Sequence, residues 1–315
     1  MSPLREALTQ YVMVRRALGT QFREPAVTLG HFVAGLDREG AEFITIDRAL
    51  RWATEPNGVQ PATWARRLTH VRRFAAWLHA ADPRTEVPPP RLLPGRRHRP
   101  QPYIFSDQDI AQLLAAAARL SSPKGVRALT YTTLIGLLAT TGLRPGEALA
   151  LQWTDVDLER GILFVRLTKF GKSRFVPVHP STCAALVAYA TRREAWGVRD
   201  PHDTFLISER NRRLRSRTAR HTFARLSCAV GLRAMTARQR CGRGPRLQDF
   251  RHTFATRTLV AWYRAGLDVE RELPTLSTYL GHVDVAHTYW YISAVPELLQ
   301  LATDRLCGRP GGEAR

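Results

Sequence analysis

At two positions, the local sequence pattern places a cationic side chain where an anion would bind favourably. The first is Arg144, in the segment TTGLRPGEALALQW. Proline suits the first turn of a helix, so Pro145 predicts a helix that begins directly after Arg144. The exposed N–H groups of that helix and the guanidinium would bind an anion together. Glu147 is placed to orient Arg144 through a salt bridge, and a capped helix with a surface arginine is the alternative interpretation.

The second position is a predicted hairpin tip, TKFGKSR, which holds Lys169 and Lys172. The chain has 44 arginines and only three lysines, so two lysines in one turn are unexpected if positive charge alone is needed. A lysine differs from an arginine because its pKa can fall toward neutrality, so that it can give up a proton. The pattern predicts a general acid at Lys169, with a chance cluster of solvated turn residues as the alternative.

Two further segments predict helices that carry charged and aromatic side chains. In RLQDFRHTFATRTL, the spacing of Phe250 and Phe254 predicts one buried face, with Arg251 on a neighbouring face. In LSTYLGHVDVAHTYWY, Gly281 is expected to end a helix in a left-handed cap, with His282 just outside it. A lone histidine after a glycine is more often structural than catalytic.

Two tyrosines, Tyr289 and Tyr291, follow in the sequence TYWY. Residues two apart on a helix point about 200° apart, so the two phenols cannot both face one site. A phenol has a pKa near 10 and is a poor nucleophile at neutral pH unless its surroundings favour the anion. Aromatic residues in such a pattern are more often part of a core, which is the alternative here.

Taken together, the four segments resemble the tyrosine recombinase (phage integrase) family. The resemblance rests on TGLRPGEAL, on K-x-x-K in a hairpin followed by V-P, on DFRHTFAT, and on L-G-H followed nine residues later by tyrosine. By motif it covers residues 105–306. The helical N-terminal region and the basic linker fit that family's core-binding domain in kind, without specific motifs.

The resemblance implies a role for each matching residue. Arg144 and Arg251 match the two arginines that clamp the scissile phosphate. Lys169 matches the lysine that protonates the leaving 5′-oxygen, and Lys172 is expected to contact the DNA backbone. His282 matches the hydrogen-bond donor that precedes the tyrosine.

By the same resemblance, Tyr291 is the nucleophile and Tyr289 is structural. Attack by Tyr291 would give a 3′-phosphotyrosine link and a free 5′-hydroxyl. Because the covalent link keeps the energy of the phosphodiester, rejoining would require neither ATP nor a metal. We therefore expect no cofactor and no metal site, in keeping with the lack of a P-loop or a magnesium-binding carboxylate cluster in the sequence.

One position departs from the family pattern. The family usually has H-x-x-R, but Gln248 stands three residues before Arg251. Glutamine can donate a hydrogen bond to a phosphate oxygen, yet it cannot exchange a proton near neutral pH. His252 is not an obvious substitute, because it lies about 100° around the helix from Arg251. We expect the Gln248 side chain to point at the phosphate and not into the core.

The composition fits a protein that binds a polyanion. Lysine and arginine total 47 against 27 acidic residues, for a formal net charge of +20 and a pI near 11.1. Hydrophobic residues at 44% and charged residues at 23% are typical of a soluble globular protein. The apolar stretch 129–143 is too short and too polar to span a bilayer, and no signal-peptide pattern is seen. Four scattered cysteines indicate free thiols and a cytoplasmic location.

The elements that position these residues fall into two predicted domains. Residues 1–82 predict an all-helical core-binding domain, and a proline-rich basic linker follows over 83–102. Residues 103–307 form the catalytic domain, in which an alternating segment, 154–178, predicts a three-stranded meander among helices. The expected fold class is mainly α with a small antiparallel β-sheet, arranged as a two-domain C-shaped DNA clamp. Residues 308–315 are expected to be disordered.

Clusters of basic residues are candidates for contacts with the DNA backbone. They lie on the last helix predicted for the first domain, in the linker, at the hairpin tip and in the segment ERNRRLRSRTAR. A solvated surface is the alternative for each cluster. The candidates are Arg66, Arg67, Arg73, Arg96, Arg97, Arg99, Lys172, Arg213 and Arg215.

The predicted function is a site-specific DNA recombinase or integrase from a mobile genetic element. Its partners are double-stranded DNA and further copies of the chain, a tetramer in the synaptic complex, with a monomer in solution left open and no membrane. The C-terminal stretch with Leu298 and Leu306 packs either on its own chain or on a neighbouring protomer. A type IB topoisomerase-like enzyme shares the chemistry, and a catalytically silent DNA-binding protein is the alternative that Gln248 makes conceivable.

Overall fold

The structure is a computed structural model, and some segments of the chain lie outside its description. It describes residues 2–95, 101–166, 173–196, 204–236, 241–282, 284, 288–289, 291, 298–300 and 303. The chain divides into two units, Met1–Pro100 and Gln101–Arg315, and each has its own hydrophobic core. Five predicted site residues lie outside the described residues: Lys169, Lys172, Arg96, Arg97 and Arg99.

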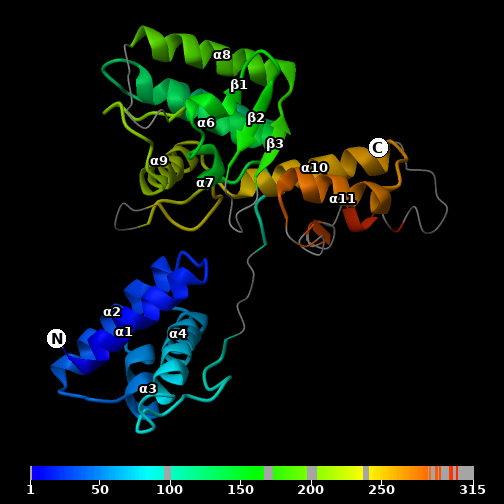
Figure 1. The fold of residues 1–315 in the computed structure, drawn as a ribbon. Helices are drawn as coiled ribbons and strands as arrows, with labels where there is room; N and C mark the ends of the chain where they lie inside the picture. The colour runs from blue at the N-terminus through cyan, green and yellow to red at the C-terminus, as the bar shows by residue number, and fades with distance from the viewer. Residues whose placement is uncertain are drawn as a thin grey trace. The chain divides into compact units, whose positions relative to one another are not determined.

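The regular structure described in the first unit is entirely helical, as predicted (Figure 1). Its helices are α1 (Pro3–Ala17), α2 (Arg23–Arg38), α3 (Ile46–Thr54) and α4 (Pro61–His79). A proline in the first turn begins both α1 and α4. The apolar faces of the helices meet in a core in which Leu29, Ile44 and Phe74 are fully buried.

Helix α6 (Val126–Thr141) lies in the core of the second unit. It is buried over most of its surface and packs against α5, α8 and α10. The side chains of Ser106 and Asp109 form a capping box that begins α5. The other helices described in this unit are α5 (Asp107–Ala118), α7 (Pro145–Ala148), α8 (Pro180–Ala195), α9 (Ser216–Ala229), α10 (Asp249–Arg264) and α11 (Val269–Leu280).

A small antiparallel sheet lies beside these helices (Figure 1), with the strand order β1-β2-β3. Leu163 pairs with Val176 on its buried face, and Phe164 pairs with Phe175 on the other. The predicted meander and the predicted fold class, mainly α with a small antiparallel sheet, are confirmed. The strands are β1 (Val156–Asp157), β2 (Ile162–Val165) and β3 (Arg174–Pro177).

Three further observations concern the described residues alone. Cys183, Cys228 and Cys241 are free thiols. Within the described ranges, no three histidine, cysteine or acidic side chains lie close enough to hold a metal ion together. No helix in the described part of the chain is long and apolar enough to cross a membrane.

Candidate active site

The candidate site surrounds the C-terminal end of α11, where three arginines bind three consecutive carbonyl oxygens. Nη2 of Arg251 donates to the carbonyl of Leu280 at 2.6 Å, and Nη2 of Arg144 donates to that of Gly281 at 3.2 Å. Nε of Arg174 donates to the carbonyl of residue 279 at 2.8 Å. Carbonyls at a helix C-terminus carry partial negative charge, so three cationic side chains stabilise this end.

Two glycines in the left-handed conformation end the helices that meet here. Gly281 ends α11 with φ = 67°, as predicted, and the N–H of His282 then donates back to the helix at 2.9 Å. Gly142 ends α6 with φ = 61°, and its carbonyl accepts a hydrogen bond from Nη1 of Arg251 at 3.1 Å. The Arg251 guanidinium therefore joins the ends of α6 and α11.

Arg144 stands at the predicted junction between a loop and a helix. It is the N-cap of α7, with Pro145 in the first turn. Nη1 of Arg144 lies 2.7 Å from Oε1 of Glu147, and its backbone N–H donates to Oε2 at 3.1 Å. The predicted salt bridge is confirmed, and the Arg144 side chain remains 31% exposed.

Glu147 also binds Arg174, a residue that the sequence did not single out. Nη2 and Nη1 of Arg174 lie 2.8 and 3.3 Å from the two carboxylate oxygens of Glu147. Both side chains are nearly buried, at 11% and 8% exposed. Burial alone would raise the pKa of Glu147, but hydrogen bonds from Arg174 and Arg144 and the charge of Arg174 outweigh it and hold the pKa below its ordinary value. The carboxylate is therefore ionised at neutral pH.

Burial also changes the ionisation of two other groups at this helix end. The Arg251 side chain is only 1% exposed, and its burial, together with the charge of Arg144, lowers its pKa to about 10. The guanidinium therefore remains protonated at neutral pH. Burial raises the pKa of Tyr279 to about 12, although Arg174 and Arg251 oppose that shift. Tyr279 is therefore a neutral phenol at neutral pH.

Tyr291 is buried beside two imidazole rings. Its side chain is 3% exposed and belongs to an apolar cluster with residues of α10 and α11. The ring of His282 lies 6.0 Å away and nearly parallel, and Nδ1 of His282 lies 2.8 Å from the hydroxyl of Thr288. Tyr289 is 48% exposed, so the two tyrosines lie in different surroundings, as predicted.

The structure places His252 beside Tyr291. From its angle on the helix relative to Arg251, His252 was not an obvious substitute for a proton acceptor at position 248. In the structure the His252 ring lies 5.4 Å from the Tyr291 ring, at an interplanar angle of 59°. The comparison with Arg251 alone gave no sign of this contact, because Tyr291 packs against α10 on the side of His252. The expectation that His252 does not replace the missing base stays a prediction.

Gln248 lies on the wall of a cavity of about 430 Å³ and is not turned into the core. The cavity is also lined by Pro145 and Gly146, in the first turn of the helix that follows Arg144. Three arginines complete the charged part of its lining: Arg220, Arg233 and Arg246. This position agrees with the expectation that Gln248 avoids the core, and its contact with a phosphate stays a prediction.

The three predicted DNA-contact residues on α4 lie in different environments. Arg73 is exposed, and Arg66 is 58% exposed beside a carboxylate of Glu24, at 3.6 Å. The Arg67 guanidinium lies 3.8 Å from the ring centroid of Trp52 and donates to its carbonyl at 2.7 Å. Arg67 therefore holds α4 against α3, and its contact with DNA stays a prediction.

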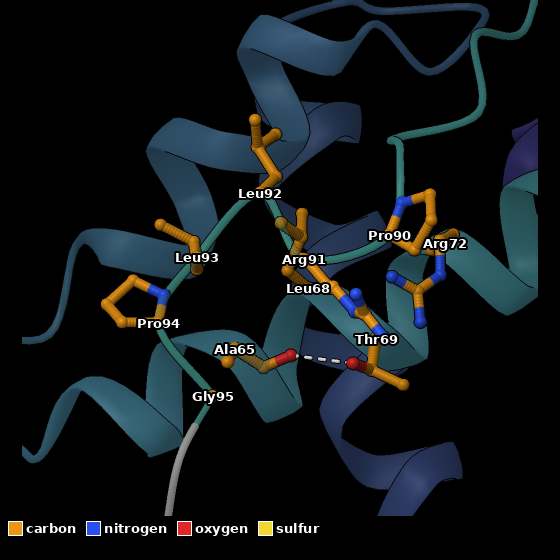
Figure 2. A pocket seen from close by; sticks show the side chains of 10 residues that line it. All are labelled: Ala65, Leu68, Thr69, Arg72, Pro90, Arg91, Leu92, Leu93, Pro94 and Gly95. Atoms are coloured by element: carbon orange, nitrogen blue, oxygen red, sulfur yellow. Dashed lines mark hydrogen bonds between the residues drawn. The ribbon is translucent and has the colours of Figure 1, made fainter.

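A pocket of about 700 Å³ lies between α4 and residues 90–95 (Figure 2). Arg72 and Arg91 are among its lining side chains, with Leu68 and Thr69 from the helix. The hydroxyl of Thr69 is used within the helix, because it donates to the carbonyl of Ala65 at 2.7 Å. The pocket therefore brings together two cations, one from the predicted DNA-contact helix and one from the predicted linker.

The predicted contact residues before α9 are both exposed. Arg215 is the N-cap residue of α9, and Nε of Arg213 donates to the carbonyl of Leu149 at 3.0 Å. This hydrogen bond ties the segment before α9 to the segment after α7. Contacts of both residues with DNA stay predictions.

Comparison of the sequence with known proteins gives consistent matches. The sequence model of the phage integrase family matches residues 104–297. The chain is 46% identical over 310 residues to the integrase/recombinase y4rB of Sinorhizobium fredii, covering 97% of this chain and 98% of that protein. It is 31% identical over 273 residues to the tyrosine recombinase XerD of Caulobacter vibrioides, covering 86% and 81%.

Two solved structures share the fold at low sequence identity. The Tn1549 transposon integrase in complex with transposon right end DNA has a TM-score of 0.66 at 16% identity, covering 96% of this chain and 99% of that one. A lambda integrase dimer bound to a COC′ core site has a TM-score of 0.60 at 17% identity, covering 91% and 94%. At these identities the likeness concerns the fold.

Proposed function

The chain belongs to the phage integrase family, and on that premise we propose that it is a site-specific recombinase that cleaves and rejoins double-stranded DNA through a 3′-phosphotyrosine bond. The observation that carries the proposal is the pair Arg144 and Arg251, which bind consecutive carbonyls of one helix end. Arg251 also lies close enough to Tyr291 for an electrostatic interaction, because Tyr291 is among the groups that act to raise the pKa of Arg251.

In the proposed reaction, Oη of Tyr291 forms a bond to phosphorus and the bond from phosphorus to the 5′-oxygen breaks. The 5′-oxygen takes up a proton, and attack by a 5′-hydroxyl later reverses the step. Each ester bond that breaks is replaced by another, so the reaction needs no external energy source. The work of the protein is to stabilise the phenolate and the pentacoordinate phosphorus.

The arginines are proposed to supply this stabilisation. The Arg144 guanidinium is one-third exposed, so it can reach a phosphate oxygen directly. Arg251 is buried, where a charge is screened less than at the surface and acts more strongly on the reacting phosphate. His282, which follows the cap of α11, is proposed to donate a hydrogen bond to the same phosphate.

Two roles in this proposal rest on the sequence. Lys169, in the segment between β2 and β3, is proposed to protonate the leaving oxygen, with Lys172 on the DNA backbone. Gln248 is proposed to donate a hydrogen bond to the phosphate, a role supported by its place in a cavity with three arginines beside the start of α7. Glutamine cannot accept the phenol proton as a base, so we expect slow deprotonation of the nucleophile.

The proposal also covers the DNA substrate, the assembly, the cellular location and the origin of the protein. The excess of basic residues supports binding to duplex DNA. We propose a tetramer in the synaptic complex, a cytoplasmic location, and an origin in a mobile genetic element. The transposon integrase among the structural neighbours is in keeping with that origin.

Capture of DNA on the protein in its native cell tests the proposal. Cells that express the wild-type chain or Tyr291→Phe are lysed in denaturant, and DNA that remains attached to the protein is sequenced. We expect wild type to retain fragments that end at a common site, and Tyr291→Phe to retain none. Specific binding under native conditions without any covalent DNA would instead identify a silent DNA-binding protein.

A further inference from the structure

Arg174 connects three separate parts of the candidate site. It is the first residue of β3, and its guanidinium binds both carboxylate oxygens of Glu147. The remaining nitrogen, Nε, donates to the carbonyl of Tyr279 in the last turn of α11 at 2.8 Å. The strand, the helix that follows Arg144 and the end of α11 therefore meet at one side chain.

We propose that Arg174 is a positioning residue for strand cleavage, which holds Glu147 so that the charge of Arg144 stays available to the scissile phosphate. The inference rests on the proposed function and adds a residue to its machinery. Arg174 acts through Glu147 and Arg144, and no contact between Arg174 and DNA is involved.

The charges around Glu147 explain why a second arginine is needed. One carboxylate lies between Arg144, 2.7 Å away, and Arg174, 2.8 Å away, so the three groups carry one net positive charge. Without Arg174, Glu147 and Arg144 would form a neutral pair. Because Glu147 is nearly buried, water would do little to screen its attraction for Arg144. The phosphate would then meet a neutral pair in place of a cation.

The shape of the site requires an arginine at this position. The planar guanidinium donates to a carboxylate with two nitrogens and to a carbonyl with the third, whereas a lysine ammonium cannot match this fork. The backbone makes room for it, because a Cβ added at Gly281 would lie 2.8 Å from Nη1 and 3.0 Å from Cζ of Arg174. The glycine that caps α11 thus also leaves space for the Arg174 side chain.

The test compares single-turnover cleavage of a nicked duplex that carries the site mapped by DNA capture. Arg174→Met removes the charge and keeps a similar length, and we expect it to slow cleavage about 100-fold while DNA affinity stays within about twofold. Arg174→Lys is expected to recover only part of the loss. Arg160→Met is the matched control, because Arg160 is 80% exposed in a surface ion pair and its loss is expected to leave the rate unchanged.

Two further comparisons separate the charge effect from a general loss of structure. In the double variant Arg174→Met/Glu147→Gln, no carboxylate neutralises Arg144, so cleavage should recover about tenfold relative to Arg174→Met. A duplex with a methylphosphonate at the scissile position has lost a negative charge, so the defect of Arg174→Met should shrink to about tenfold or less. Circular dichroism and thermal melting verify that each variant is folded.

The inference is overturned if wild type cleaves and Arg174→Met cleaves within threefold of it. It is also overturned if Arg174→Met slows cleavage by the same factor on the normal and the methylphosphonate duplex, and the double variant Arg174→Met/Glu147→Gln cleaves no faster than Arg174→Met. That combination is expected of a residue with a purely structural role. If wild type itself forms no covalent adduct, the proposed function fails and the inference fails with it. The wild-type reaction therefore distinguishes the two failures.

Discussion

Arg144 and Arg251 bind the carbonyl oxygens of two neighbouring residues, Gly281 and Leu280, although Arg144 precedes α7 and Arg251 lies on α10. The end of α11 thus fixes the spacing between the two guanidinium groups that we propose to act on one phosphate. His282 follows directly after this end. One helix terminus therefore sets the relative positions of three proposed reacting groups. A substitution at this terminus should slow cleavage by more than its effect on the free energy of unfolding would explain.

Gly281→Ala tests this view of the helix end. The substitution strains a backbone with φ = 67° and drives a Cβ against the Arg174 guanidinium. Gly266→Ala is the matched control, since Gly266 has φ = 71° with no atom within 4 Å of an added Cβ. We expect the control to lower the free energy of unfolding by about 1 kcal/mol and leave cleavage intact. Gly281→Ala should lower both the free energy of unfolding and the rate of cleavage. An equal effect of the two substitutions on cleavage would contradict the proposed role of this helix end.

Glu147→Gln should change how stability depends on pH. The pKa of Glu147 is below its ordinary value of 4.5 in the folded protein, so the folded state binds fewer protons than the unfolded chain at acid pH. Its contribution to stability is therefore present above pH 4.5 and is lost as the pH falls through the folded pKa. Denaturant unfolding of Glu147→Gln should show a deficit against wild type above pH 4.5 that shrinks at lower pH.

A surface ion pair provides the control for that experiment. Asp47 pairs with Arg51, and the Asp47 side chain is 85% exposed. Asp47→Asn should change the free energy of unfolding by less than about 0.5 kcal/mol. A deficit of Glu147→Gln that stays constant from neutral pH to pH 3 would contradict the assignment of an ionised, buried Glu147.

Gln248→His should speed strand cleavage. A histidine at this position can accept a proton near pH 6.5, which glutamine cannot. Single-turnover cleavage at neutral pH is expected to rise about tenfold or more, with a new dependence on pH centred near 6.5. Gln248→Ala is expected to be slower than wild type, because the hydrogen bond to the phosphate is lost. If Gln248→His changes neither rate nor pH dependence, the neighbouring His252 becomes the candidate for proton transfer.

Two arginines of α4 should respond differently to replacement. Arg73 is exposed, so Arg73→Ala should weaken the salt dependence of DNA binding. A plot of log affinity for a non-specific duplex against log salt concentration should become less steep by about one. The Arg67 guanidinium packs on Trp52, so Arg67→Ala should lower the free energy of unfolding by about 1 kcal/mol with little change in slope. Binding at several salt concentrations and denaturant unfolding check both. The reverse pattern would place Arg67 on the DNA.

Local sequence was sufficient where partners lie close together in the chain. The junction at Arg144, its salt bridge to Glu147 and the left-handed cap at Gly281 each depend on a few neighbouring residues, and all three were predicted. The mainly α fold with a small sheet followed from periodicity, because the period of apolar residues changes from helical to alternating over β2 and β3.

Contacts between distant segments were missed. The partners of Arg174 lie 27 and 105 residues away, so no local pattern identifies them. A signal was nevertheless present, because Arg174 shares a strand face with the buried Val176, and an arginine on a buried face requires acceptors. The contact between His252 and Tyr291 was missed for the same reason, because the two residues lie far apart in the sequence.

In the proposed reaction, Tyr291 forms a covalent bond with DNA. Wild type, Tyr291→Phe and Tyr289→Phe are incubated with a duplex that is nicked beside the mapped site, so that the cleaved fragment diffuses away and the adduct accumulates. We expect a protein–DNA adduct with wild type and with Tyr289→Phe, because the Tyr289 side chain is half exposed, and none with Tyr291→Phe. An adduct that survives Tyr291→Phe, or is lost with Tyr289→Phe, would contradict the proposed role of Tyr291.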